Sequence, residues 1–147
     1  MRIYLLFTKF FMLVAFLAVS GCISNQNSYK FPDAKFDANS KIFVVKNPDD
    51  KKDLSEILAE SFRARGFSVE LGSIQGVPEY SDVLVEYDVQ WWWDVGWYIT
   101  DFQVTLLDLH SDNLLLYASS NRSSLARKSP RYVVDEVVAK VMEEFDD

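Results

Sequence analysis

Two segments of alternating apolar and polar residues flank a cluster of tryptophans, and this arrangement constrains the fold more than any other feature of the chain. In residues 82–90 and 98–106, aliphatic and aromatic residues alternate with acidic, amide and hydroxyl residues. Such alternation is typical of β-strands that bury one face. The run Trp91-Trp92-Trp93-Asp94-Val95-Gly96-Trp97 between them contains all 4 tryptophans of the chain. The sequence therefore predicts an antiparallel hairpin with the tryptophans at its tip.

The register of this hairpin follows from matching the faces of its two strands. A three-residue loop sets Val89 opposite Asp101 and mixes apolar with polar residues. A four-residue loop, Asp94 to Trp97, matches the faces and sets Trp93 opposite Tyr98. The matched pairs are Val89 with Phe102, Tyr87 with Val104, Val85 with Leu106, Gln90 with Asp101, and Asp88 with Gln103. We therefore predict the four-residue loop, with Trp91 and Trp93 on the helix-covered face and Trp92 on the open face.

The remainder of the chain from residue 40 onwards contains three more strand signals and two helix signals. Short apolar runs predict strands at residues 41–46, 67–71 and 114–122. Asn47-Pro48 and Ser129-Pro130 have the form of a helix cap followed by a first-turn proline, and each precedes apolar residues at helical spacing. The order β-α-β-β-β-β-α predicts an α+β two-layer sandwich. Two helices would cover one face of a mixed, mostly antiparallel sheet of about five strands.

The amino-terminal residues have a different character. Arg2 and Lys9 precede or flank a fully apolar run, Phe10–Val19, which is too short to cross a bilayer. The run ends in Val19-Ser20-Gly21-Cys22, and Cys22 is the only cysteine. This segment resembles the signal peptide and lipobox of bacterial lipoproteins. The resemblance implies cleavage before Cys22, a diacylglyceryl thioether on its sulfur and an acylated amino terminus.

The lipobox also divides the chain and implies a location. We expect a signal peptide at residues 1–21, a lipidated tether at residues 22–39 and a single α+β domain at residues 40–147. The residue after the cysteine is Ile23 rather than aspartate. By resemblance to Gram-negative lipoproteins, this implies the outer membrane, on its periplasmic side, with the lipid bilayer as the first partner. A Gram-positive cell surface remains an alternative.

The domain has a looser resemblance of its own. It is carried by Trp93-Asp94, Tyr98, Leu106-Leu107-Asp108 and, after a turn, Leu114-Leu115, together with the order of elements. These features resemble small, uncharacterised Gram-negative lipoproteins. Those proteins share an architecture with the TolB amino-terminal domain, CsgG-type curli secretion lipoproteins and the lipoprotein activators of penicillin-binding proteins. The resemblance implies a role in envelope assembly or as a scaffold. The tether here is shorter than the linkers of those activators.

Charge and side-chain chemistry exclude several functional classes. The net charge is -7, and removal of Arg2 and Lys9 with a signal peptide makes it about -9. Such a domain gains nothing from phosphate backbones, so we expect no nucleic-acid partner. His110, the only histidine, lies in a predicted turn, and no nucleophile, metal ligand set or glycine-rich phosphate loop accompanies it. The sequence therefore predicts no catalytic site, no metal and no cofactor.

The open face of the sheet supplies a candidate interaction surface. Its predicted members are Trp92, Trp97, Ile99, Leu84 and Leu107. An exposed apolar stripe of this kind usually marks a contact surface. Alternatively, the tether aromatics Tyr29, Phe31 and Phe36 cover it. Two functions follow: a non-catalytic interaction or scaffold module that binds an envelope protein or a second copy, or a binding protein for a small apolar or glycan ligand in an aromatic-lined pocket.

Overall fold

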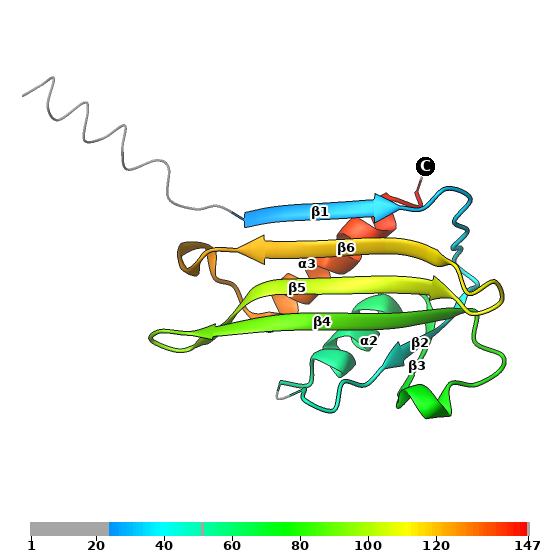
Figure 1. The fold of residues 1–147 in the computed structure, drawn as a ribbon, viewed down its shortest axis with the longest axis horizontal. Coiled ribbons are helices and arrows are strands. Elements are labelled where there is room, and N and C mark those ends of the chain that lie inside the picture. The colour runs from blue at the N-terminus through cyan, green and yellow to red at the C-terminus, as the bar shows by residue number, and fades with distance from the viewer. Residues whose placement is uncertain (1–23, 51, 147) are drawn as a thin grey trace, which may run out of the picture.

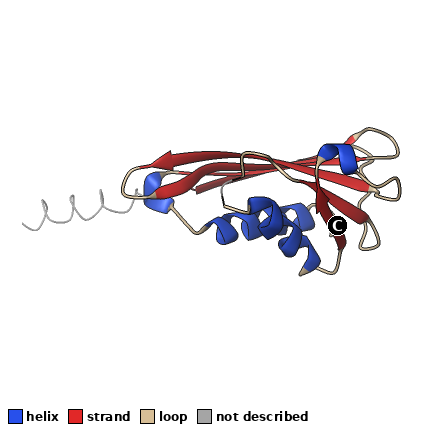
Figure 2. Ribbon diagram, turned by 90° about the horizontal axis from the view of Figure 1, so that it is seen from below, coloured by secondary structure: helices blue, strands red, loops and turns tan. Residues whose placement is uncertain are grey.

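The computed structural model describes residues 24–50 and 52–146. The predicted signal peptide and lipidation site, Cys22, lie outside these residues. Within them, two long helices pack against one face of a six-stranded sheet (Figures 1 and 2). The strands are β1 (Ser24–Lys30), β2 (Lys41–Val45), β3 (Ser68–Gly72), β4 (Val83–Trp93), β5 (Trp97–Asp108) and β6 (Leu114–Arg122). The helices are α2 (Leu54–Arg63) and α3 (Pro130–Glu143), with short 3-10 turns η1 (Ile74–Gly76) and η2 (Ser124–Ala126).

The order of strands across the sheet is β1-β6-β5-β4-β2-β3. Strand β2 pairs in parallel with both β3 and β4, and the other pairs are antiparallel. The β2-α2-β3 unit is thus a parallel crossover, and β4, β5 and β6 form a meander. The predicted α+β fold is confirmed, with six strands in place of about five.

The additional strand comes from the segment expected to be a tether. Strand β1 pairs with β6 along its whole length, from Ser24 opposite Arg122 to Lys30 opposite Leu116. The Lys30 ammonium donates a 2.6 Å hydrogen bond to the backbone oxygen of Glu144, beyond the end of α3. The sequence of β1, SNQNSYK, has no apolar alternation. Its backbone ladder, rather than burial of side chains, holds it in the sheet.

The core lies between the sheet and the two helices. It contains Ile42, Val44, Leu58, Phe62, Val85, Phe102, Val104, Leu106, Val134, Val137, Val138 and Val141, all at most 1% exposed. Phe36 joins the same core, with its ring 4.8 Å from that of Phe67 and 5.1 Å from that of Phe145. Residues from position 36 to position 145 therefore contribute to one continuous core.

The two helix starts differ in how well they were predicted. The Ser129 side chain accepts a hydrogen bond from the Tyr132 N–H, and Pro130 is in the first turn, as expected. Helix α2, in contrast, begins at Leu54 and not at Asn47-Pro48. The Asn47 side chain instead accepts from the Asp49 N–H at 2.9 Å, a local turn that competes with helix capping. The Asp50 carboxylate instead caps the first turn of α2, because its Oδ2 atom accepts a 2.9 Å hydrogen bond from the Ser55 N–H.

Two aromatic residues on either side of the β1 boundary test whether this segment belongs to the domain. We expect Phe36→Ala to lower the free energy of unfolding by about 3–5 kcal/mol, because it removes a buried ring. The matched variant Tyr29→Ala removes a ring that is 57% exposed and should cost about 1 kcal/mol or less. Urea unfolding followed by circular dichroism measures both. Equal, small effects would mean that residues 24–39 are not part of the stable domain.

Candidate functional site

The β4–β5 hairpin is the longest strand pair in the described part of the molecule, and its register changes near the tip. All five pairs predicted from the matched faces are present, from Val85 opposite Leu106 to Gln90 opposite Asp101. Beyond Gln90 the register shifts, so that Trp91 lies opposite Ile99 and Trp93 opposite Trp97. The loop is therefore Asp94-Val95-Gly96, and the predicted four-residue loop is wrong.

A β-bulge causes this difference. Thr100 is the additional residue, and its hydroxyl donates a hydrogen bond to the Gln90 carbonyl at 3.2 Å. A bulge lets two residues of one strand face a single residue of the other. Ile99 and Phe102 both reach the core as a result, although simple alternation would place them on opposite faces.

Three of the tryptophan side chains at the tip are exposed. Trp92 is 63%, Trp93 58% and Trp97 64% exposed, and Val95 in the loop is 93% exposed. Trp91 alone is half-buried and packs against the core, on the helix-covered side as predicted. Trp93 was expected under the helices, but the tip extends past the ends of α2 and α3 (Figures 1 and 2). An apolar patch is thus concentrated at one end of the molecule.

The other predicted members of the interaction surface lie elsewhere. Ile99 is 1% exposed and belongs to the core, because of the bulge. Leu84 is buried and Leu107 is half-buried. They lie near the far end of the sheet, where the loop containing η1 lies on the face opposite the long helices (Figure 2). Phe36, one of the aromatics expected to cover the open face, packs on the helix side instead.

The loop after β6 is joined to the tip by one charged pair. The Arg127 guanidinium donates to both carboxylate oxygens of Asp94, at 2.9 and 2.8 Å. It also lies 4.8 Å from the centre of the Tyr98 ring. The backbone N–H of Val95, and after it the Arg127 guanidinium, hold the pKa of Asp94 below its usual value. These contacts tie the basic loop to the hairpin.

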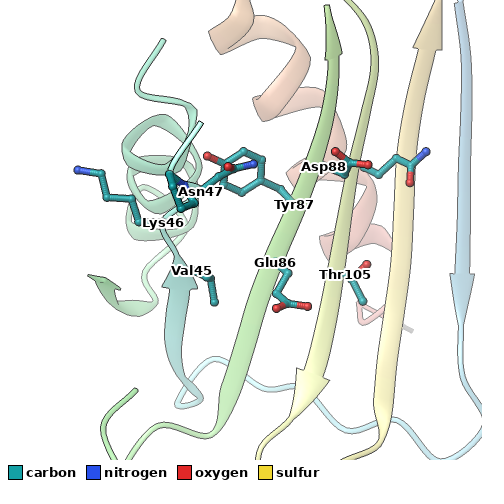
Figure 3. A pocket seen from close by; sticks show the side chains of 9 residues that line it. Val45, Lys46, Asn47, Glu86, Tyr87, Asp88 and Thr105 are labelled. Carbon is teal, nitrogen blue, oxygen red and sulfur yellow. The ribbon is translucent and has the colours of Figure 1, made fainter. Parts of the chain in front are cut away.

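Two depressions lie beside the hairpin, one at the middle of β4 and one at the tip. One, of about 400 Å³, is lined by the end of β2 and by Glu86, Tyr87 and Asp88 of β4 (Figure 3). The Tyr87 hydroxyl donates a 2.9 Å hydrogen bond to Asp50, and burial together with that carboxylate raises the pKa of Tyr87. The other, of about 550 Å³, is lined by Trp91 and Trp97 with polar neighbours that include Asp49, Lys52 and Asp88.

His110 lies at the opposite end of the molecule, in the turn between β5 and β6. Its side chain is 64% exposed, and Nε2 lies 3.0 Å from Asp82 Oδ1. Among residues 24–50 and 52–146, no group of three or more histidine, cysteine or acidic side chains is arranged to hold a metal ion. None of the helices in these two ranges has the length and apolar character needed to cross a membrane.

Comparison with known proteins identifies the fold and no family. No family model matches the chain, and no curated protein matches it. Among solved structures, a PelC dodecamer from Paraburkholderia phytofirmans that carries a single substitution is similar, with a TM-score of 0.59, 18% identity and coverage of 84% of this chain and 97% of that chain. A second PelC dodecamer structure from the same organism has a TM-score of 0.59 and 17% identity, and the match covers 84% of this chain and 97% of that chain. At this identity the likeness shows a shared fold. TolB from Acinetobacter baumannii, with a TM-score of 0.47, 16% identity and coverage of 83% and 32%, is too distant to support an argument.

The single histidine offers a test of the ion pair at the far end. The hydrogen bond to Asp82 raises the pKa of His110 above its ordinary value of 6.5. While Asp82 is ionised, the pair therefore stabilises the fold fully below pH 6.5 and loses this contribution as the pH rises through the raised pKa of His110. A nuclear magnetic resonance titration of the His110 ring should show the elevated pKa, and Asp82→Asn should return it towards 6.5. The same pKa in both proteins would exclude the ion pair.

Proposed function

We propose that this protein is a non-catalytic interaction module of the bacterial cell envelope, anchored through a lipid on Cys22 to the periplasmic side of the outer membrane. The hairpin tip, defined here as residues 91–97, is its contact surface. The observation that carries the proposal is the concentration of three exposed tryptophans, Trp92, Trp93 and Trp97, at one end of the domain. The lipobox ending at Cys22 supplies the anchor.

The energetics of the tip support a role in binding rather than in folding. Tryptophan buries about 150–250 Å² when it is covered, and it is enriched among the residues that dominate binding energy. A domain gains no stability from tryptophan rings that stay in water. Trp92, Trp93 and Trp97 project beyond the helices, and the core forms without them. Their apolar area is therefore available to another surface.

Self-association is one form that this interaction can take. The similar PelC structures are described as dodecamers. In this chain, β2 pairs with β4 only from Val83 to Val85, so the part of β4 from Glu86 onwards pairs with β5 alone. An unpaired strand edge can form a ladder with another chain.

Size-exclusion chromatography with light scattering on residues 24–147 tests self-association. We expect a mass that is a multiple of the monomer mass, and a monomer at all concentrations would contradict self-association.

A second candidate function is the binding of a small apolar or glycan ligand. The cleft lined by Trp91 and Trp97 supports it, since its volume of about 550 Å³ is in the usual range for ligand pockets. Titration with short glycans or fatty acids, followed by tryptophan emission, tests this function. A saturable change that Trp97→Ala abolishes would support it, and the absence of any change would count against it.

The anchor is tested in cells. We expect the wild-type chain in the membrane fraction as a shortened, acylated form that incorporates labelled palmitate. Cys22→Ser should abolish the label and leave the protein unprocessed or soluble, because no other cysteine can carry the thioether. Ser20→Ala, which keeps a small residue before Gly21, is the matched control and should retain the label. A Cys22→Ser protein that still appears as a cleaved membrane form would refute the anchor.

A further inference from the structure

We propose that the hairpin tip and the loop after β6 together form a docking surface for the bilayer in which the lipid of Cys22 is inserted. The tryptophan rings lie in the headgroup region, and the Lys128 ammonium lies over a lipid phosphate. This inference names the partner of the contact surface and rests on the proposed function.

The register of the sheet places the start of β1 and the hairpin tip at the same end of the molecule. Ser24 is paired with Arg122, the neighbouring Asn121 with Asp101, and Asp101 with Gln90. Ser24 is therefore level with the base of the tip, and Figure 1 shows the start of β1 and the tip at the same end of the sheet. Cys22 precedes Ser24 by two residues, a reach of at most about 7 Å.

The dimensions of the sheet bring the tip to the level of the anchor. Beyond Gln90, Trp91 to Trp93 extend the hairpin by about 10 Å, at about 3.3 Å per residue. Strands β1 and β4 are separated by three strand spacings, about 15 Å. A lipid attached at Cys22 therefore keeps the tip within reach of the bilayer surface.

The side chains at this end suit the membrane interface. Tryptophan is enriched at the level of lipid headgroups, where its ring meets both apolar and polar surroundings. Beside the three exposed tryptophans, Val95 is 93% exposed, and Leu125 in η2 is 73% exposed. Five large apolar side chains therefore project from one end of a strongly acidic domain.

Lys128 supplies a positive charge at the same end of the molecule as the tip. In the tip and in residues 122–128, the charged residues are Arg122, Arg127, Lys128 and Asp94. Arg122 is buried and paired with Glu136, and Arg127 is paired with Asp94, so Lys128 carries the net positive charge of this region. Lys128 lies 5.2 Å from the centre of the Tyr132 ring, and both line a pocket of about 220 Å³ that Ser24 also lines. The opposite end carries acidic residues, among them Asp37, Asp82, Asp108 and Glu144, together with Lys30, Lys35 and Lys41.

Tryptophan fluorescence tests the proposal directly, because all 4 tryptophans lie in the tip. The lipidated protein is reconstituted in vesicles of phosphatidylcholine and phosphatidylglycerol. We expect a blue-shifted emission, quenching by brominated phosphatidylcholine and protection from acrylamide, each relative to the chain from residue 22 with Cys22→Ser in solution. The measurement is made on protein that floats with the vesicles. If its emission and its quenching by acrylamide equal those of the soluble chain, the proposal is overturned.

A second arm separates this proposal from the lipidation of Cys22. The Cys22→Ser chain from residue 22, with an amino-terminal histidine tag, is held on vesicles that contain a nickel-chelating lipid. Quenching by brominated lipid is expected here as well, whether or not Cys22 is acylated in cells. Failure of palmitate labelling would therefore refute the anchor alone, whereas absence of quenching in both arms would refute the docking surface.

Paired variants locate the contact. Lys128→Gln should lower the equilibrium constant for docking of the tip by about fivefold at low salt, the effect of removing one basic residue near an anionic surface, and the difference should shrink in high salt. Lys35→Gln changes the net charge equally at the opposite end of the molecule and should have no effect. Trp92→Ala with Trp97→Ala should reduce the emission shift of the remaining tryptophans, while Tyr80→Ala, a 55% exposed ring near the far end, should not. Equal effects within either pair would contradict the assignment.

Discussion

The pairing of β4 with β5 is the interaction on which the rest of the structure depends. From Val85 opposite Leu106 to Val89 opposite Phe102, it aligns one apolar face of the sheet beneath the two helices. A slip of one residue would turn this face towards water, so the packing of α2 and α3 fixes the register. The bulge at Thr100 then changes the register where the helices end. It returns Ile99 to the core while the tip continues beyond it.

The sequence predicts those parts of the fold that burial of side chains determines. Alternation in β4 and β5 is enough to predict their pairing, and the apolar stripe of α3 is enough to predict its buried face. Strand β1 could not be predicted this way, because its polar side chains are ordered by a backbone ladder with β6 and by contacts with Glu144. The start of α2 was misplaced because Asn47 satisfies a nearby backbone N–H instead of a helix terminus.

The candidate site could be predicted only in part for a related reason. The exposure of Trp92 and Trp97 follows from their position at a hairpin tip. Ile99 was assigned to the same surface because alternation was extended through residues where a bulge interrupts it. The difference between the two ends of the molecule also depends on tertiary structure. Only the order of strands in the sheet brings Ser24, the tip and Arg127 to one end and the acidic turns to the other.

The central claim is that the tryptophans of the tip serve binding and not folding. The most direct measurement compares the free energy of unfolding of the Trp92→Ala, Trp97→Ala double variant with that of Phe102→Ala, by urea denaturation followed with circular dichroism. Phe102 is fully buried, and its truncation should cost about 3–5 kcal/mol. The double variant removes two rings that are each more than 60% exposed and should cost about 1 kcal/mol or less. A loss of stability in the double variant as large as that of Phe102→Ala would show that the tip is part of the folded core, and would contradict the account.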